Sequence, residues 1–400
     1  MKAYIPNNLN LGAEKHSDKY YFILTFIFYG NLKDKRNEVK SFIELNSLFL
    51  KSIIGGRYKT YLQHLIDLGV IETDNFYVVK TKSKGYRLTE KYRNVKAKQV
   101  EITDKNILQN YAKLKRRCSN GISLKQHKYI LSCLEQIEIQ YEEAKYFIES
   151  TITNIDEYFS YSYSIDLIKA KDWFFVVDKT AGRIHNNITN LSKNLRPFLR
   201  YQNQNLVEID IANSQPFLFN VLIQNYCLHY LLTITPTSGN LNLSYVHPNY
   251  TEYPDIGLFR QLTAEGKFYE YLMNEWSIKE ERSLFKLRFF KRVFYSKENK
   301  KYVFKERKKF QELFPTIAQV ISFYKRDDYC RLAIELQRIE ADIVINRIVP
   351  KLAEQKIFIV TIHDSFLTTY DNCKVVEKTI LEVFENSYGL KPTVRIKGGK

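Results

Sequence analysis

The chain has 400 residues, of which 44% are hydrophobic and 14% aromatic, a composition that excludes a disordered protein. This length provides material for two or three domains. The 61 Lys and Arg residues exceed the 44 Asp and Glu residues and give a net charge of +17. Such a charge favours a polyanionic partner, with nucleic acid ahead of an anionic membrane surface, and a lysine-rich surface kept for solubility is the alternative.

The cysteines and the hydropathy pattern indicate a cellular setting. The five cysteines are scattered and include no Cys-x-x-Cys pair, which predicts a reducing compartment without a disulfide framework or a zinc site. The N-terminus has no apolar signal core, and no stretch of about eighteen apolar residues occurs. We therefore expect a cytoplasmic protein that does not enter membranes.

Residues 1–95 are expected to form a separate domain. Apolar residues recur at three- and four-residue spacing in 41–54 and in 56–68, which predicts two amphipathic helices. The following segment, 70–88, alternates between apolar and polar residues and has turn residues at two places, as in a β-hairpin. Helix, helix and basic hairpin together resemble a winged helix.

In a winged helix the second helix would enter a major groove of nucleic acid. Here that helix would carry Arg57, Lys59 and Gln63. Three lysines of the hairpin would contact phosphates: Lys80, Lys82 and Lys84. A winged helix that makes only protein contacts is the alternative.

Residues 96–165 are helical in pattern and highly charged, and a long periodic segment runs from Leu124 to Ile148. This region is expected to be a helical linker or a thumb-like segment. The composition becomes aromatic and β-branched near residue 165, so a boundary is expected there, with a further domain over 166–400.

Two aspartates follow apolar, β-branched runs. The sequence "LVEIDI" ends a predicted strand with Asp210, and "FIVTIHDSF" ends another with Asp364. An unpaired buried carboxylate is costly, and two of them on neighbouring strands can hold a pair of divalent ions for nucleotidyl transfer. Mg²⁺ needs few protein carboxylates, since water and substrate phosphates complete its shell. Two unrelated strand-end acids are the alternative.

Residues 282–295 predict a basic helix. Four side chains at successive four-residue steps would share one face of it: Arg282, Lys286, Phe290 and Phe294. A triphosphate could lie on the two cations while a base stacks on Phe290. A basic amphipathic helix on a membrane or in a core is the alternative.

These three stretches, in this order, resemble motifs A, B and C of family A DNA polymerases and the related phage-type single-subunit RNA polymerases. The resemblance implies an α+β fold with a right-hand palm and fingers over 166–400. It also implies that Asp210 and Asp364 are catalytic and hold two Mg²⁺ or Mn²⁺ ions, with the carbonyl of Ile211 completing the second site. Catalytic Lys286 would face the leaving phosphates, and the remaining nucleotide contacts would come from four residues: Arg282, Phe290, Phe294 and Gln215.

Flanking segments extend the resemblance. The stretches "KTAGRIHNNITNLSKNLRPFL" and "LQRIEADIVINRIV" are similar to conserved segments before motif A and before motif C. Together with the histidine of motif C, which is His363, they imply that five residues contact the primer–template: Arg183, Asn190, Arg196, Gln337 and His363.

The resemblance implies a template-directed nucleotidyltransferase from a mobile element or phage, with a DNA or RNA primer–template and nucleoside triphosphates as partners. Gln215 stands where DNA polymerases have a glutamate that screens the sugar, and "HDSF" is closer to RNA polymerases. An RNA-synthesising primase or RNA polymerase-like enzyme is therefore one alternative. A catalytically inactive DNA-binding replication or regulatory protein is the other.

Overall fold

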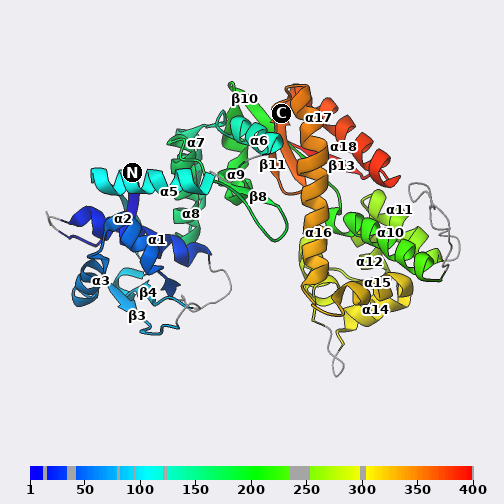
Figure 1. The fold of residues 1–400 in the computed structure, drawn as a ribbon, viewed down its shortest axis with the longest axis horizontal. Coiled ribbons are helices and arrows are strands. Elements are labelled where there is room, and N and C mark those ends of the chain that lie inside the picture. The colour runs from blue at the N-terminus through cyan, green and yellow to red at the C-terminus, as the bar shows by residue number, and fades with distance from the viewer. Residues whose placement is uncertain are drawn as a thin grey trace. The chain divides into compact units, whose positions relative to one another are not determined.

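The computed structural model has a mixed α+β fold, as expected from the sequence. It describes residues 1–11, 16–33, 42–78, 82–93, 95–119, 122, 124–234, 253–297 and 303–398. The chain forms two compact units (Figure 1). The first unit comprises Met1–Ile122, Ile137–Phe175 and Asn190–Arg200, and the second comprises Ser123–Gln136, Val176–Thr189 and Tyr201–Lys400. The domain limits expected near residues 95 and 165 both fall within segments of the first unit.

The first unit alternates short strands with helices. Its elements are β1 (Lys2–Pro6), α1 (Ser17–Lys33), β2 (Ile43–Glu44), α2 (Ser47–Ile54), α3 (Tyr58–Asp67), β3 (Ile71–Thr73), β4 (Gly85–Leu88), α4 (Glu90–Arg93), β5 (Ala97–Glu101), α5 (Lys105–Ser119), β6 (Glu138–Ile139), α7 (Tyr141–Thr151), α8 (Ile155–Lys169) and the 3₁₀ helix η1 (Lys193–Phe198). The short strands β7 (Phe175–Val177) and β9 (Leu199–Tyr201) lie at the ends of its segments.

The second helix and the hairpin expected near the N-terminus are confirmed. The helix expected over 41–54 is confirmed only for Ser47–Ile54, because Ile43–Glu44 form strand β2, which pairs with β4. Helix α2 begins after Asn46, whose side-chain oxygen accepts hydrogen bonds from two backbone N–H groups of the first turn, and ends at Gly55 with a φ of 91°. Strands β3 and β4 pair antiparallel, with Ile71 opposite Leu88, and β2 adds to the other side of β4. The hairpin residue Lys80 lies outside the described part of the chain.

The continuous periodic helix expected from Leu124 to Ile148 is wrong. Helix α6 (Lys125–Leu134) ends early, and the chain becomes extended at β6 before α7 begins. Strand β6 pairs antiparallel with β9, so that Glu138 lies opposite Arg200. Because this partner is distant in sequence, local periodicity does not reveal the break.

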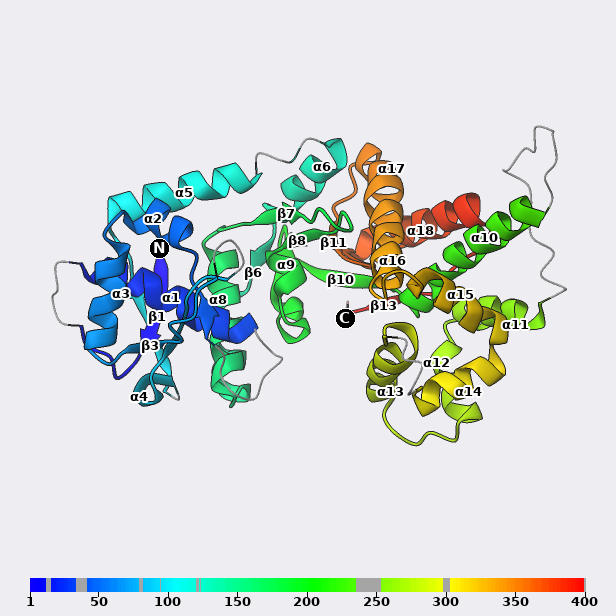
Figure 2. The same cartoon turned by 60° about the horizontal axis from the view of Figure 1, so that its bottom comes forward.

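The second unit begins with α6, β8 (Ile184–Asn186) and α9 (Asn187–Asn190), and continues with β10 (Gln204–Ile211), α10 (Ser214–Ile234), α11 (Pro254–Ala264), α12 (Phe268–Glu275), α13 (Arg282–Phe289) and the π-helix η3 (Phe290–Phe294). There follow α14 (Lys305–Leu313), α15 (Pro315–Lys325), α16 (Arg331–Ala341), the π-helix η4 (Asp342–Ile348), α17 (Val349–Glu354), β11 (Val360–Ile362), β12 (Ser365–Thr369), η5 (Tyr370–Asn372), α18 (Cys373–Tyr388) and β13 (Val394–Lys397). Figures 1 and 2 show α16 and α17 as one continuous helix, which η4 joins.

Strand β10 lies at the centre of an antiparallel sheet in the second unit. It pairs with β12 on one side and with β13 on the other, and β11 pairs with the far side of β12. Helix α18 packs on β10, and α10 packs against α16. None of the helices in the described part of the chain combines the length and apolar character needed to cross a bilayer.

Candidate active site around two aspartates

The sheet brings Asp210 and Asp364 together. Asp210 lies near the end of β10, opposite Ser365 on β12. Asp364 precedes Ser365, in the two-residue turn of the hairpin that β11 and β12 form. His363, the other turn residue, has a φ of 56°, a left-handed conformation that only a few per cent of non-glycine residues adopt. Two carboxylates about 150 residues apart in the sequence therefore meet, one near the end of β10 and the other in the turn that leads into the adjacent strand β12.

The charges of this pair influence each other. Burial raises the pKa of Asp364, and the charge of Asp210 raises it further, while the Ser214 hydroxyl and the Lys286 ammonium lower it. Asp210 forms an ion pair with Lys397, the last residue of β13. The Nζ atom of Lys397 lies 2.5 Å from Oδ2 of Asp210. Asp210 thus has a cation of the chain itself beside it.

The donor set fits a divalent cation that keeps several non-protein ligands. The described residues contain no cluster of three or more His, Cys, Asp or Glu suited to a metal. Carboxylate oxygens on two strands nevertheless match the preference of Mg²⁺ for a few carboxylates plus water and phosphate. A cation there would also relieve the repulsion that raises the pKa of Asp364. Ile211, whose carbonyl was expected to contribute, pairs with Val394 on β13.

Helix α13 starts next to the turn that follows Asp210. The Nη2 atom of Arg282 donates to Oδ1 of Asn213 at 2.9 Å, and its Nε lies 2.5 Å from Oε1 of Glu270. Asn213 is buried and has a φ of 52°. Arg282 is therefore held by an acid of α12 while it anchors α13 to the β10–α10 turn.

Three of the four residues predicted to share one face of the basic helix, Arg282, Lys286 and Phe290, are at least partly exposed. Lys286 is exposed, and its Nζ lies 6.0 Å from the centre of the Phe290 ring. Phe290 is half-buried and stacks on Tyr295, with ring centres 5.3 Å apart and planes at 11°. Phe294, expected on the same face as a nucleotide contact, is instead fully buried against Phe219.

The reason for this correction is the π-helix that starts at Phe290. Its turn is wider than that of an α-helix, so the residues after Phe290 are rotated about the helix axis relative to the α-helical positions, although the ring centres of Phe290 and Phe294 still lie 5.9 Å apart. Phe294 accordingly turns into the aromatic core, where its ring also meets that of Phe289.

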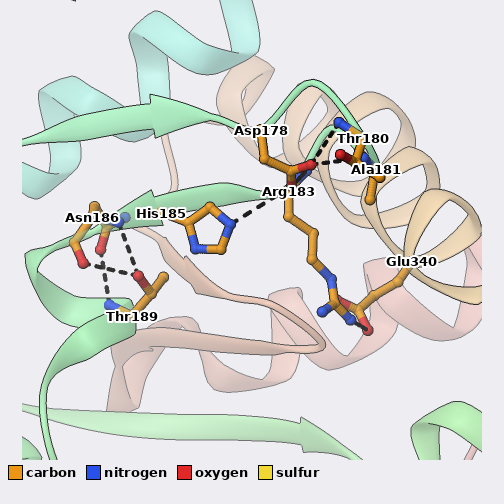
Figure 3. A network of polar contacts seen from close by, with 8 residues as sticks. All are labelled: Asp178, Thr180, Ala181, Arg183, His185, Asn186, Thr189 and Glu340. Carbon is orange, nitrogen blue, oxygen red and sulfur yellow. Dashed lines mark hydrogen bonds and ion pairs between the residues drawn. The ribbon is translucent and has the colours of Figure 1, made fainter. Parts of the chain in front are cut away.

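A turn between β7 and β8 directs Arg183 towards α16 (Figure 3). The carboxylate of Asp178 accepts hydrogen bonds from the backbone N–H groups of Thr180, Ala181 and Arg183, at 2.7–2.9 Å. Burial opposes ionisation of Asp178, but these bonds hold its pKa below the usual value. At the end of this turn, Nη2 of Arg183 lies 2.7 Å from Oε2 of Glu340.

Glu340 is a functional candidate that the sequence analysis missed. Only 2% of its side chain is exposed, and Nε2 of Gln215 also donates to its Oε2 at 2.8 Å. Gln215 in turn accepts a hydrogen bond from the hydroxyl of Tyr295 at 3.0 Å. Burial, and then the charge of Asp364, raise the pKa of Glu340 to about 7, although Arg183 lowers it. The sequence pattern could have indicated this burial. Glu340 follows Leu332 and Leu336 at four-residue steps on one face of a helix, and both leucines are also buried.

The other predicted contacts divide between the two units. His363 and His185 lie with ring centres 5.8 Å apart in the second unit, where Gln337 is half-buried on α16. Asn190 is the first residue of the segment Asn190–Arg200 of the first unit, and Arg196 lies within that segment. Two further predicted residues, Arg57 and Lys59, are exposed at the start of α3 in the first unit.

No protein-family model matches the chain, and no curated protein matches it. A functional assignment therefore depends on the chemistry of the site itself.

Proposed function

We propose that this protein is a metal-dependent, template-directed nucleotidyltransferase of the DNA polymerase type, with its active site at Asp210 and Asp364. The observation that supports this proposal is the meeting of three distant segments in the second unit. The β10 strand carries Asp210, the β11–β12 turn carries Asp364, and α13 carries Lys286, whose ammonium lowers the pKa of Asp364.

The chemistry of the residues matches the proposed roles. Asp210 and Asp364 would hold Mg²⁺, which when bound supplies positive charge for the attacking oxygen and for the triphosphate. Lys286 is exposed beside this pair, so it can bind phosphate oxygens and stabilise the charge that develops on leaving pyrophosphate. Phe290 offers part of its ring to a base, whereas Arg282 positions α13. Lys397 would leave Asp210 when a cation replaces it.

We further propose that residues 1–95 contain a winged helix that binds nucleic acid. The chain order α1, β2, α2, α3, β3, β4 and the sheet order β2-β4-β3 support this proposal. The first basic residues of α3, Arg57 and Lys59, are exposed. A net charge of +17 is suited to tracking a phosphate backbone.

The proposal is tested by primer extension with the full chain, using DNA and RNA templates and both deoxyribo- and ribonucleotides. We expect Mg²⁺-dependent incorporation, which Asp210→Asn or Asp364→Asn lowers by 10²-fold or more, on the scale of a lost electrostatic contact in a transition state. Asp371→Asn is the matched control, since that aspartate is exposed beyond β12. Incorporation that survives either active-site variant at more than about a tenth of the original rate would refute the assignment.

The nucleotide comparison decides between the enzyme classes. Preferential use of ribonucleotides would identify an RNA-synthesising enzyme built on the same two aspartates. Binding of primer–template without incorporation under any metal or nucleotide condition would identify an inactive replication or regulatory protein.

A further inference from the structure

A hollow of about 530 Å³ lies in the first unit between α3 and the β3–β4 hairpin. This volume is within the range of pockets that bind small organic groups, roughly 300–1,000 Å³. The residues that give its walls their chemistry come from the helix and from both sides of the hairpin: Tyr58, Lys59, Gln63, Asn75, Tyr77 and Lys84.

The floor of the hollow is apolar, and its rim is basic. Leu45, Leu62 and Tyr86 line it and are buried. The charged residues that line it are Lys59 and Lys84, both exposed, and no acidic residue is among its lining residues in the described part of the chain. This combination suits a flat, apolar group that carries negative charge at its edge.

Two tyrosines and two amides complete the match to a nucleotide. Tyr77 is 59% exposed on the hairpin, and Tyr58 is half-buried at the start of α3. Gln63 donates from its Nε2 to Asp67 at 2.8 Å, and its carbonyl oxygen accepts no hydrogen bond from the described residues. Asn75 uses its Oδ1 to accept from Lys84 at 3.4 Å. A carbonyl and an amide N–H₂ are thus available to the edge of a base.

We propose that this hollow binds an unpaired nucleotide of a nucleic-acid strand. The base stacks on the Tyr77 ring above the apolar floor, while Lys59 and Lys84 contact the flanking phosphates. A base inside a duplex cannot reach such a hollow without leaving its stack. The first unit is therefore expected to prefer single strands or frayed ends over intact duplex. This site is independent of the two aspartates, which belong to the second unit.

The experiment uses the full chain and an oligonucleotide with 2-aminopurine, whose fluorescence falls when it stacks on a ring. We expect quenching that Tyr77→Ala abolishes, with binding weakened about 5- to 150-fold, the equivalent of the 1–3 kcal/mol that one stacked base contributes. Phe76→Ala is the matched control, because Phe76 is the adjacent ring, is 55% exposed and does not line the hollow. Lys84→Ala and the control Lys51→Ala test the phosphate contacts in the same way.

The outcomes separate this site from the proposed enzyme. Asp364→Asn is expected to keep the quenching, so loss of catalysis and loss of this site are independent results. Equal losses for Tyr77→Ala and Phe76→Ala would overturn the proposal. So would duplex that competes as well as single strand, or photocrosslinks from a 5-iodouracil oligonucleotide that fall only in the second unit. Unchanged nucleic-acid binding by Tyr77→Ala would also overturn it and would indicate that the hollow binds a peptide segment instead.

Discussion

Replacing Glu340 by Gln keeps the shape of the side chain and removes its charge, so it isolates the electrostatic cost of a buried carboxylate. The folded chain raises the pKa of Glu340 from 4.5 to about 7, first by burial and then through the charge of Asp364. Between these two values the native state holds a proton that the unfolded chain has lost. The free energy of unfolding must therefore fall as pH rises through this window, and this contribution is fully present only below it.

The magnitude follows from the same two values. The interval from 4.5 to about 7 corresponds to about 3 kcal/mol, at roughly 1.36 kcal/mol for each pH unit. Wild-type protein should lose about that much unfolding free energy through Glu340 between pH 4.5 and 8. Glu340→Gln should not lose it, because an amide does not titrate and still offers an oxygen to Arg183. The variant should thus be the more stable protein at pH 8 and close to wild type at pH 4.5.

Urea denaturation of both proteins from pH 4.5 to 8, in the presence of EDTA, measures this difference. Glu335→Gln is the matched control, since Glu335 lies on the same helix but contacts Arg338 near the surface. Added Mg²⁺ should reduce the pH dependence of wild type, because neutralising Asp364 removes the second cause of the raised pKa. Identical pH profiles would refute the reasoning. So would a variant destabilised at pH 8 by the 3–5 kcal/mol typical of a broken buried ion pair.

Four further outcomes are expected. Lys286→Ala should slow nucleotide transfer more than it weakens primer–template binding, whereas Leu287→Ala, the adjacent residue with 68% exposure, should change neither; steady-state kinetics and binding assays measure both. Phe294→Ala should lower the unfolding free energy by about 3–5 kcal/mol in denaturation experiments, while Phe290→Ala should mainly raise the apparent nucleotide KM; a reversed pattern would contradict the π-helical geometry. Lys397→Met should lower the Mg²⁺ concentration for half-maximal activity, because it removes a cation that competes for the same carboxylate; an unchanged Mg²⁺ titration would refute this. Binding of primer–template should weaken by about 10³-fold or more between 50 and 200 mM salt if six or more phosphates are contacted, and a flat salt titration would exclude backbone tracking.

The sequence predicted the elements whose pattern is local. The apolar run ending in Asp210 forms β10, and residues 282–289 form a helix with its basic residues at the expected spacing. Both depend on side chains within a few positions of one another. The break after α6 could not be found in this way, because β6 is extended through its pairing with β9.

The site residues also divide into those that a local pattern predicted and those whose position depends on distant strand pairing. That Asp210 and Asp364 would lie close together was predicted from two similar strand ends, and the register of β10 with β12 places Asp210 opposite Ser365, the residue after Asp364. Lys397 was not predicted, because its contact with Asp210 depends on β13 pairing with β10 across much of the chain. Glu340 was hidden because an acid within a helix usually faces solvent.

The turn at His363 links the backbone of the hairpin to the chemistry of the site. Ile362 and Ser365 pair directly, so the chain must reverse within two residues, and the first of them takes a φ of 56°. Glycine adopts this conformation at no steric cost, whereas histidine raises the energy of the turn by about 1–2 kcal/mol. Asp364, the second turn residue, comes directly before Ser365, which pairs with Asp210. We attribute the strained histidine at that position to its ring, which contacts the ring of His185 beside the Arg183 turn. Through this contact the turn that carries Asp364 lies next to the segment of the proposed primer contacts.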